Sequence, residues 1–169
     1  MIKYLLDTNI VIYVIKRRPV EVMGVFSQNA GRMAISAVTL SELYHGAEKS
    51  TMVAKNLSVV EEFASLLEVL PYTAKASQHY GAIRASLEKM GRPIGVNDLH
   101  IAAHARSEGL VLVTNNLGEF ERVPGRWTET WVAGLCCGSS GLGRGAGQDE
   151  GRDAERLALG RGIAVGLGV

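Results

Sequence analysis

Acidic and amide side chains follow the predicted strands or lie early in the predicted helices. Asp7 ends the first apolar run, Glu42 lies one turn into the helix after the second strand, and Asp98 opens a later helix. Four more such residues follow the last strong strand: Asn115, Asn116, Glu119 and Glu121. Carboxylates that converge in one cleft repel each other unless a cation holds them. Oxygen ligands without cysteine suit Mg²⁺ or Mn²⁺, and such an ion would generate a hydroxide-like nucleophile and shield phosphate charge.

Each of these residues also has an ordinary structural explanation. Asp98 fits a helix N-cap, and Thr39 and Glu42 have the spacing of a capping box. A single Asp after a strand, such as Asp7, commonly forms a turn. Glu119 and the acid two residues after it are of a type usually found on the solvated surface. The residue types alone therefore leave both explanations open.

Two other patterns carry weaker indications of chemistry. His100 and His104 are four residues apart on a predicted helix, a spacing found in zinc sites. The segment between them lacks the catalytic Glu of that motif and no third ligand is evident, which favours packing or a surface position. Ser36 and Ser41 have no recognisable partner base, so a serine hydrolase is disfavoured.

Strand-like and helix-like segments alternate along the part of the chain that carries these residues. The predicted strands cover residues 3–6, 33–36 and 110–114, with residues 69–70 as a strand or helix stop and an edge strand near Trp131. The predicted helices cover residues 39–48, 56–67, 74–90 and 98–108, and residues 10–16 fit either type. This alternation predicts an α/β fold with a mostly parallel sheet. Ligands of such sheets bind at the carboxyl ends of the strands, where the acids lie.

Composition limits the class of protein. The chain has 169 residues, 47% hydrophobic and 21% charged, which suits one globular domain and excludes wholesale disorder. Its net charge of +1 means that a nucleic-acid partner would need a local basic patch. The two cysteines, Cys136 and Cys137, are adjacent, and the apolar run at residues 10–15 is too short to span a membrane. We expect a soluble, cytoplasmic protein without a membrane partner.

Glycine content divides the chain at about residue 132. Residues 1–132 contain nine of the 20 glycines, whereas residues 133–169 contain the other eleven. We interpret residues 1–132 as the folded domain and residues 133–169 as a Gly-rich, disordered tail. A shifted reading frame or read-through past a lost stop would produce such a tail, and a genuine flexible extension is the alternative.

Four segments, taken in order and with their spacing, resemble the PIN-domain family, and more narrowly the VapC toxins of bacterial toxin–antitoxin modules. They are residues 5–9 (Leu-Leu-Asp-Thr-Asn), residues 35–43, residues 91–98 with 101–105, and residues 113–116 with Glu119 and Phe120. The resemblance runs from Met1 to about Trp131. It implies a Rossmann-like, three-layer α/β/α fold and an endoribonuclease that uses Mg²⁺ or Mn²⁺. Close relatives cut transfer RNA near the anticodon.

The resemblance also assigns roles to residues. The family's metal-binding acids fall on Asp7, Glu42 and Asp98, and its fourth acidic position falls on Asn116. An Asn there contributes a neutral ligand, so the carboxylate count depends on Glu119 or Glu121. Polar positions beside the acids fall on Thr8, Asn9, Thr39 and Asn115.

Partners follow from the same resemblance. Toxins of this family are held inactive by a cognate VapB-type antitoxin, and they commonly form homodimers. Candidate contacts to the RNA backbone are Lys16, Arg17, Arg18, Arg84 and Arg92, although the first three also suit an ordinary solvated helix end.

Two rival interpretations come from other classes. A haloacid-dehalogenase-type phosphatase also begins with a strand ending in Asp, but it requires D-x-D, and position 9 is Asn. A non-catalytic PIN-fold module that binds RNA or an antitoxin is the second rival, if Asn116 or the tail has removed activity.

Overall fold

A computed structural model describes residues 1–125 and 128–132 of this protein. The prediction of a disordered tail concerns residues 133–169, which lie outside the described residues. The strands are β1 (Tyr4–Leu6), β2 (Met33–Ser36), β3 (Glu68–Leu70), β4 (Val111–Val113) and β5 (Thr128–Glu129). The helices are α1 (Thr8–Lys16), α2 (Val20–Gln28), α3 (Ala37–Glu48), α4 (Val53–Ser65), α5 (Ala74–Lys89), α6 (Val96–Glu108) and α7 (Leu117–Phe120).

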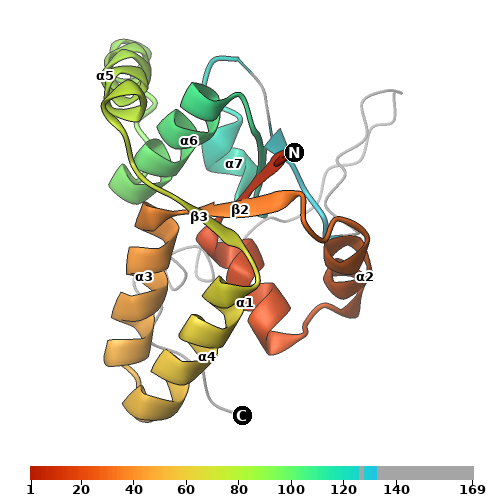
Figure 1. The fold of residues 1–169 in the computed structure, drawn as a ribbon. Coiled ribbons are helices and arrows are strands. Elements are labelled where there is room, and N and C mark those ends of the chain that lie inside the picture. The colour runs from red at the N-terminus through yellow and green to blue at the C-terminus, as the bar shows by residue number, and fades with distance from the viewer. Residues whose placement is uncertain (126–127, 133–169) are drawn as a thin grey trace, which may run out of the picture.

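The five strands form one sheet in the order β3-β2-β1-β4-β5, and every strand pairing is parallel (Figure 1). The central strand β1 pairs with β2 on one side and β4 on the other, and Leu6 lies opposite both Ile35 and Val113. The carboxyl ends of these three strands therefore meet at one edge of the sheet. The predicted α/β fold with a parallel sheet is confirmed.

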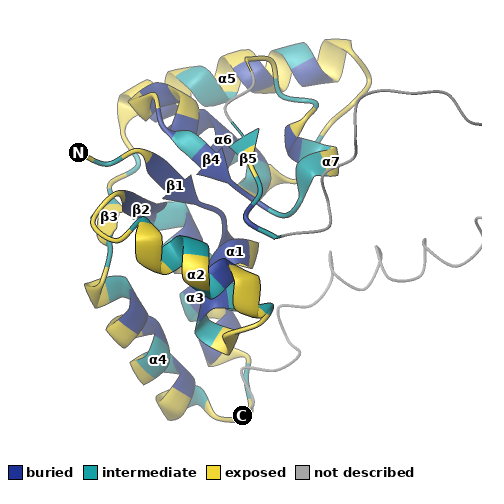
Figure 2. Ribbon diagram, turned by 90° about the vertical axis from the view of Figure 1, so that its right-hand side faces the viewer, coloured by how far each residue is buried: buried dark blue, intermediate teal, exposed yellow. Residues whose placement is uncertain are grey.

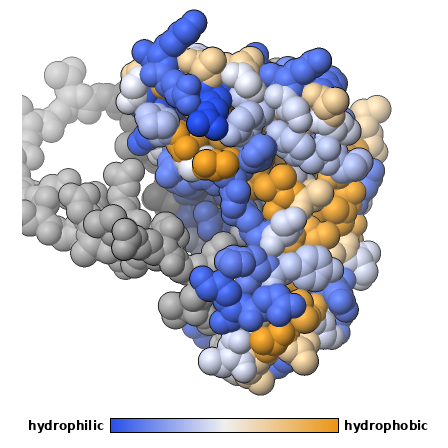
Figure 3. All heavy atoms as spheres, turned by 90° about the vertical axis from the view of Figure 1, so that its left-hand side faces the viewer, coloured by the Kyte–Doolittle hydropathy of each residue, from blue (hydrophilic) through white to orange (hydrophobic). Residues whose placement is uncertain are grey.

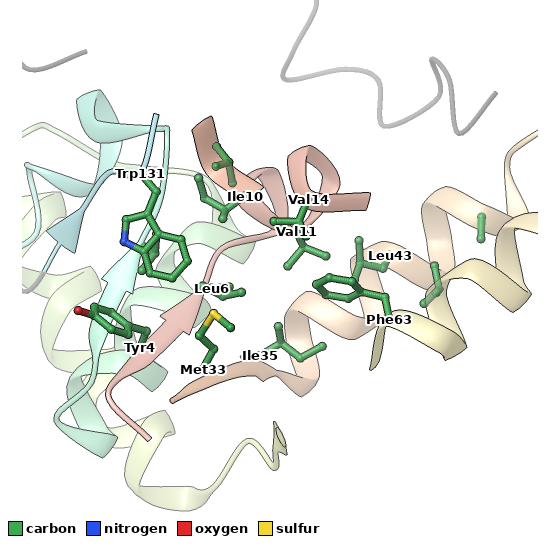
Figure 4. Packing of buried hydrophobic residues seen from close by; sticks show 14 residues of the cluster. Tyr4, Leu6, Ile10, Val11, Val14, Met33, Ile35, Leu43, Phe63 and Trp131 are labelled. Atoms are coloured by element: carbon green, nitrogen blue, oxygen red, sulfur yellow. The ribbon is translucent and has the colours of Figure 1, made fainter. Parts of the chain in front are cut away.

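Helices cover both faces of the sheet, which gives three layers (Figure 2). One face packs against α1 to α4, and Figure 4 shows side chains from the strands and from α1, α3 and α4 meeting there, among them Leu6, Ile35, Val11, Leu43 and Phe63. The other face packs against α6 and α7, with Leu5 and Leu112 meeting Ile101 and Phe120. Helix α5 packs outside α6. Successive residues of β1 serve opposite faces, as expected for a strand buried on both sides.

Several elements differ from the sequence prediction. Residues 10–16, ambiguous by pattern, belong to helix α1, which starts at Thr8, where the Asp7 carboxylate accepts a hydrogen bond from the Thr8 N–H. Helix α2 was not predicted. It contains Gly24, and Val22 is its only fully buried residue. The last strand, β5, ends before Trp131, which packs its ring edge against Tyr4.

The face that carries α3, α4, α5 and the edge strand β3 is mixed: apolar side chains gather in the middle and again near the bottom, with hydrophilic side chains between and around them (Figure 3). Strand β3 is only three residues long, and Val69 in it is 36% exposed. A short edge strand limits pairing with other chains. Among the described helices, none combines the length and apolar character needed to cross a bilayer.

Candidate active site

The first acid lies at the edge where β1 and β4 end. Asp7 follows β1 and is 1% exposed. Its Oδ1 atom accepts a hydrogen bond from the Thr8 N–H at 2.7 Å, and its Oδ2 atom accepts one from the Thr114 hydroxyl at 2.8 Å. Thr114 follows the neighbouring strand β4, so the parallel register places these two residues side by side. Asp7 is thus both the N-cap of α1 and a member of the site.

Helix α3 delivers the second acid. The N-cap of α3 is Ser36, whose hydroxyl accepts a hydrogen bond from the Val38 N–H, so the capping-box interpretation of Glu42 is wrong. The Glu42 carboxylate instead bridges two other elements. Its Oε2 atom accepts a hydrogen bond from the Thr8 hydroxyl, and its Oε1 atom accepts one from the Asn97 amide at 2.8 Å. Glu42 is therefore held between the starts of α1 and α6.

The start of α6 brings in the third and fourth acids. The N-cap of α6 is Gly95, so the N-cap interpretation of Asp98 is wrong. The Gly95 N–H donates to Glu119 Oε2 at 3.0 Å, and a Cβ at this glycine would lie 3.3 Å from Asp98 Oδ2 and 3.6 Å from Glu119 Oε2. The Asn116 amide donates to Asp98 Oδ2 at 3.3 Å. Glycine at position 95 therefore leaves the space in which two carboxylates and an amide approach each other.

We call Asp7, Glu42, Asp98 and Glu119 the acid cluster. Its electrostatics are unfavourable without a counter-charge. Burial, only partly offset by hydrogen bonds from Thr114 and Thr8, raises the pKa of Asp7 to about 6. Burial, the hydrogen bond to Glu119 and the negative charges of the neighbouring acids raise the pKa of Asp98 to about 8. Burial opposes ionisation of Glu119 too, but the Gly95 N–H and the hydrogen bond with Asp98 outweigh it and lower its pKa.

These donors fit a hard divalent cation. Carboxylate and amide oxygens are the ligands that Mg²⁺ takes, and a cation would relieve the repulsion that raises the pKa of Asp7 and Asp98. Within residues 1–125 and 128–132, no three His, Cys, Asp or Glu side chains are already arranged to hold a metal ion. Mg²⁺ usually takes only one or two protein carboxylates besides water and substrate oxygens, so a preassembled set of three is not required.

The four polar residues that were predicted to lie beside the acids differ in their contacts. Thr8 contacts the acid cluster directly through Glu42. The Asn115 amide donates to the Tyr13 hydroxyl at 3.0 Å, which ties the end of β4 to α1. The Thr39 hydroxyl is fully buried and has no hydrogen-bond partner, whereas the Asn9 side chain is exposed.

Two of the three candidates for the fourth acidic position lie close to Asp98. Asn116 and Glu119 both lie beside Asp98, while Glu121 is exposed at the end of α7. Helix α7 makes this possible, because its single turn returns Glu119 toward the start of α6. The neutral Asn116 therefore does not leave Asp98 without a neighbouring carboxylate.

The predicted RNA-contacting basic residues are not gathered at the acid cluster. Lys16 ends α1, and Arg17 and Arg18 follow it, about 13 Å along the helix from Asp7 at 1.5 Å per residue. Arg84 lies on α5, where it forms an ion pair with Glu88. A fifth basic residue, Arg92, is exposed in the segment after α5. Their contact with RNA stays a prediction.

Three site residues had no assigned role in the sequence analysis. Thr114 holds Asp7, Asn97 holds Glu42, and Gly95 contacts Glu119. Thr114 and Asn97 are the sequence neighbours of Asn115 and Asp98, which the resemblance had placed in the site, and this position could have identified them. Nothing local marks Gly95, because its importance comes from Glu119, 24 residues later.

The histidine pair on α6 packs with aromatic residues. His104 is fully buried, and its Nδ1 atom forms a 2.8 Å hydrogen bond with the Ser36 hydroxyl. The Nδ1 atom of His100 lies 2.9 Å from the Tyr72 hydroxyl, and its ring stacks on Tyr80 at 4.2 Å between centroids. We call these five residues the histidine cluster. Burial lowers the pKa of both histidines, so both rings are neutral near pH 7.

Comparison with known proteins agrees with this arrangement. The model of the PIN domain matches residues 4–126, which include every member of the acid cluster. The chain belongs to the PIN-domain family. Among curated relatives of this PIN domain protein, ribonuclease VapC2 of Haemophilus influenzae is 60% identical over 132 residues, 78% of this chain and 100% of the relative. The tRNA(fMet)-specific endonuclease VapC of Shigella flexneri is 55% identical over 131 residues, 78% of this chain and 99% of that protein.

Solved structures with chains similar to this one also come from VapBC proteins. DNA-bound VapBC from Salmonella typhimurium contains a chain that is 52% identical, with a TM-score of 0.75 over 78% of this chain and 100% of that one. VapBC2 from Rickettsia felis, bound to a DNA fragment from its promoter, contains a chain that is 41% identical, with a TM-score of 0.73 over the same shares. The predicted resemblance to PIN-domain VapC proteins is confirmed.

Proposed function

We propose that this protein is the ribonuclease toxin of a VapBC-type toxin–antitoxin pair, and that it hydrolyses RNA phosphodiester bonds in the cytoplasm with a divalent cation. The observation that carries the proposal is the acid cluster, in which four carboxylates from four segments approach each other at the carboxyl edge of a parallel sheet. The high identity to proteins named VapC ribonucleases supports it.

The residues of the cluster have distinct tasks in this proposal. Asp7, Glu42 and Asp98 would hold Mg²⁺ or Mn²⁺, with the Asn116 amide oxygen as a neutral neighbour. A bound cation supplies an activated water and charge shielding for the phosphate. Thr114 and Thr8 keep the Asp7 carboxylate in one orientation, and Asn97 does the same for Glu42. Glu119 keeps a carboxylate beside Asp98 and contributes negative charge to the cluster.

Transfer RNA is the proposed substrate class, because two of the similar proteins are named tRNA(fMet)-specific endonucleases. A cognate antitoxin is the proposed partner, since the similar solved chains come from VapBC assemblies. A basic side chain of that antitoxin would find a suitable receptor in the acid cluster. We also expect a homodimer, and size-exclusion chromatography that shows only a monomer at high concentration would contradict it.

The test is cleavage of purified total transfer RNA by the full chain with and without Mg²⁺ or Mn²⁺, with the cut sites mapped by sequencing. We expect cation-dependent cleavage that is lost in Asp7→Asn, because this change removes a ligand charge but keeps the shape of the side chain. Glu61→Gln, an exposed change on α4, is the matched control and should cleave like the unchanged protein. Normal cleavage by a folded Asp7→Asn protein would refute the site. RNA binding without cleavage by the unchanged protein would favour the non-catalytic module.

A further inference from the structure

We propose that a groove between α5 and the segment that enters α6 binds one base of the RNA substrate, one or two nucleotides from the scissile phosphate. The inference rests on the proposed ribonuclease function and adds a specificity-determining subsite to it.

The groove has apolar walls and a definite size. Its lining includes Leu87 of α5, Leu99 of α6, and Ile94, Pro93 and Val96 from the connecting segment. Its volume is about 230 Å³. That is below the roughly 300–1,000 Å³ of pockets for drug-sized ligands, and it suits a single flat ring system better than a peptide helix.

The groove and the acid cluster share the first turn of α6. Val96 lines the groove and is 59% exposed, while Asp98, two residues later, belongs to the cluster. The distance between them is at most the width of one helix, about 10–12 Å. Gly95, which contacts Glu119, connects the groove wall formed by Ile94 directly to the cluster. A strand of RNA whose phosphate lies at Asp98 therefore reaches the groove with a neighbouring nucleotide.

The rim of the groove carries a flat, prearranged cation. Arg84 Nε donates to Glu88 Oε1 at 2.8 Å, and Arg84 Nη1 donates to the Tyr80 hydroxyl at 2.9 Å. Both partners lie on the same helix and also line the groove. The guanidinium is held in one plane, and its side chain is still 52% exposed. Guanidinium planes and aromatic rings are the groups on which unstacked RNA bases stack.

Charge distinguishes a base from other occupants. Because Arg84 and Glu88 neutralise each other, this pair has no net charge that would attract a phosphate or an acidic side chain, and the nearby positive charge comes from Arg122, which donates to the Pro93 carbonyl at 3.1 Å. A base offers both hydrogen-bond donors and acceptors along its edge, so it matches a rim that presents a carboxylate and a guanidinium together. The apolar walls match its faces. The groove's chemistry is therefore that of a nucleobase subsite.

The test uses RNA hairpins that carry the mapped cleavage site, each with one stable abasic ribose at one of the two positions on either side of the scissile phosphate. Base stacking of this kind supports a loss of roughly 10- to 100-fold in kcat/KM at the one position that occupies the groove. Val96→Phe fills the groove from an exposed position, so we expect it to slow the parent hairpin but not the hairpin that is abasic at that position. Leu66→Phe, on the far end of α4 and 71% exposed, is the control and should change neither.

The possible results show whether the proposed base subsite or the proposed ribonuclease function fails. If the unchanged protein cleaves all abasic hairpins as fast as the parent, or if Val96→Phe slows parent and abasic hairpins equally, the subsite is refuted while the ribonuclease stands. If Val96→Phe weakens only the complex with the antitoxin, the groove belongs to a protein interface and the subsite is refuted. If the unchanged protein cleaves no RNA, the proposed function itself fails. Arg84→Gln gives a second variant, and we expect it to lose rate only on hairpins that retain the base.

Discussion

Helix α6 contributes buried and half-buried titratable side chains to two neighbouring regions, in which burial shifts the pKa values in opposite directions. In the acid cluster, like charges lie together, and the pKa of Asp98 is raised to about 8. In the histidine cluster, burial lowers the pKa of His104, whose ring stays neutral beside Ser36 and Tyr72. A neutral imidazole ring can be held by packing and a hydrogen bond at Nδ1, as His104 is, whereas closely spaced buried and half-buried carboxylates repel each other when ionised unless a cation binds. This difference supports the proposal that the first region binds a cation, whereas the second region is explained by packing.

The largest expected effect follows from removing charge in the acid cluster. Asp98→Asn should lower RNA cleavage by at least about 100-fold, because a ligand charge is lost. At pH 8 and without divalent cations, the same change should raise the melting temperature, because it removes a carboxylate that the fold does not stabilise in ionised form. Thermal unfolding and cleavage assays on one preparation measure both. A variant that is both active and less stable would overturn the assignment.

Removing an imidazole ring from the histidine cluster should lower the stability of the fold and leave RNA cleavage unchanged. His104→Ala deletes a fully buried side chain and its hydrogen bond with Ser36, so we expect a loss of about 2–4 kcal/mol in the free energy of unfolding. Cleavage per folded molecule should be unchanged. Urea unfolding measures the loss, and His45→Ala, an exposed change on α3, should stay within about 0.5 kcal/mol of the unchanged protein. Reduced cleavage by folded His104→Ala protein would show that the two regions are not separate.

The acid cluster and the histidine cluster should change the free energy of unfolding in opposite directions as pH rises. With Asp98 titrating at about 8, the cation-free folded state keeps a proton that the unfolded chain has already released. The free energy of unfolding therefore falls as pH rises from about 4 to 8. The histidines act oppositely, because the unfolded chain takes up their protons first as pH falls, but little of their effect remains to be gained above about pH 6.5 and it is complete by about pH 7.5.

A fall in melting temperature between pH 6.5 and 8 in the presence of a chelator is thus the signature of the acid cluster. Asp98→Asn should remove most of it. An unchanged fall in this variant would place its cause elsewhere in the chain.

The smallest expected effect concerns the Gly-rich segment. Because ordering each of its residues would cost about 1–2 kcal/mol of backbone entropy with few apolar side chains to offset it, we expect residues 133–169 to contribute little to either region. Truncation after residue 132 should change the melting temperature by less than about 2 °C and leave cleavage unchanged or improved. A drop of several degrees would show that this segment packs on the domain.

Much of the site was predictable because its residues carry local motifs. Asp7 follows β1, Asp98 lies in the first turn of α6 and Glu42 lies inside α3, the helix that directly follows β2, and the parallel order of the strands brings them to one edge. Their role as cation ligands stays a prediction. The sequence could not decide between Asn116 and Glu119, because both reach Asp98 only through the turn of α7 and the space left by Gly95.

The less predictable parts depend on packing between distant segments. Helix α2 was missed although its sequence is rich in apolar residues, and in the fold only Val22 of this helix is fully buried. The ambiguous segment at residues 10–16 is helical because Asp7 caps the helix that contains it and because its apolar residues pack on the sheet. The groove beside α6 combines residues from both sides of a helix connection, so no single motif describes it.

The most direct test of the central claim is calorimetric titration of Mn²⁺ into the full chain at pH 7, repeated in buffers of different ionisation enthalpy. At this pH Asp98 is still largely protonated and Asp7 largely ionised, so a cation bound to the acid cluster should displace close to one proton. The account predicts that Asp98→Asn abolishes this proton release and weakens Mn²⁺ binding, and that Asp7→Asn weakens binding as well. Mn²⁺ binding with the same affinity and the same proton release in both variants would contradict it.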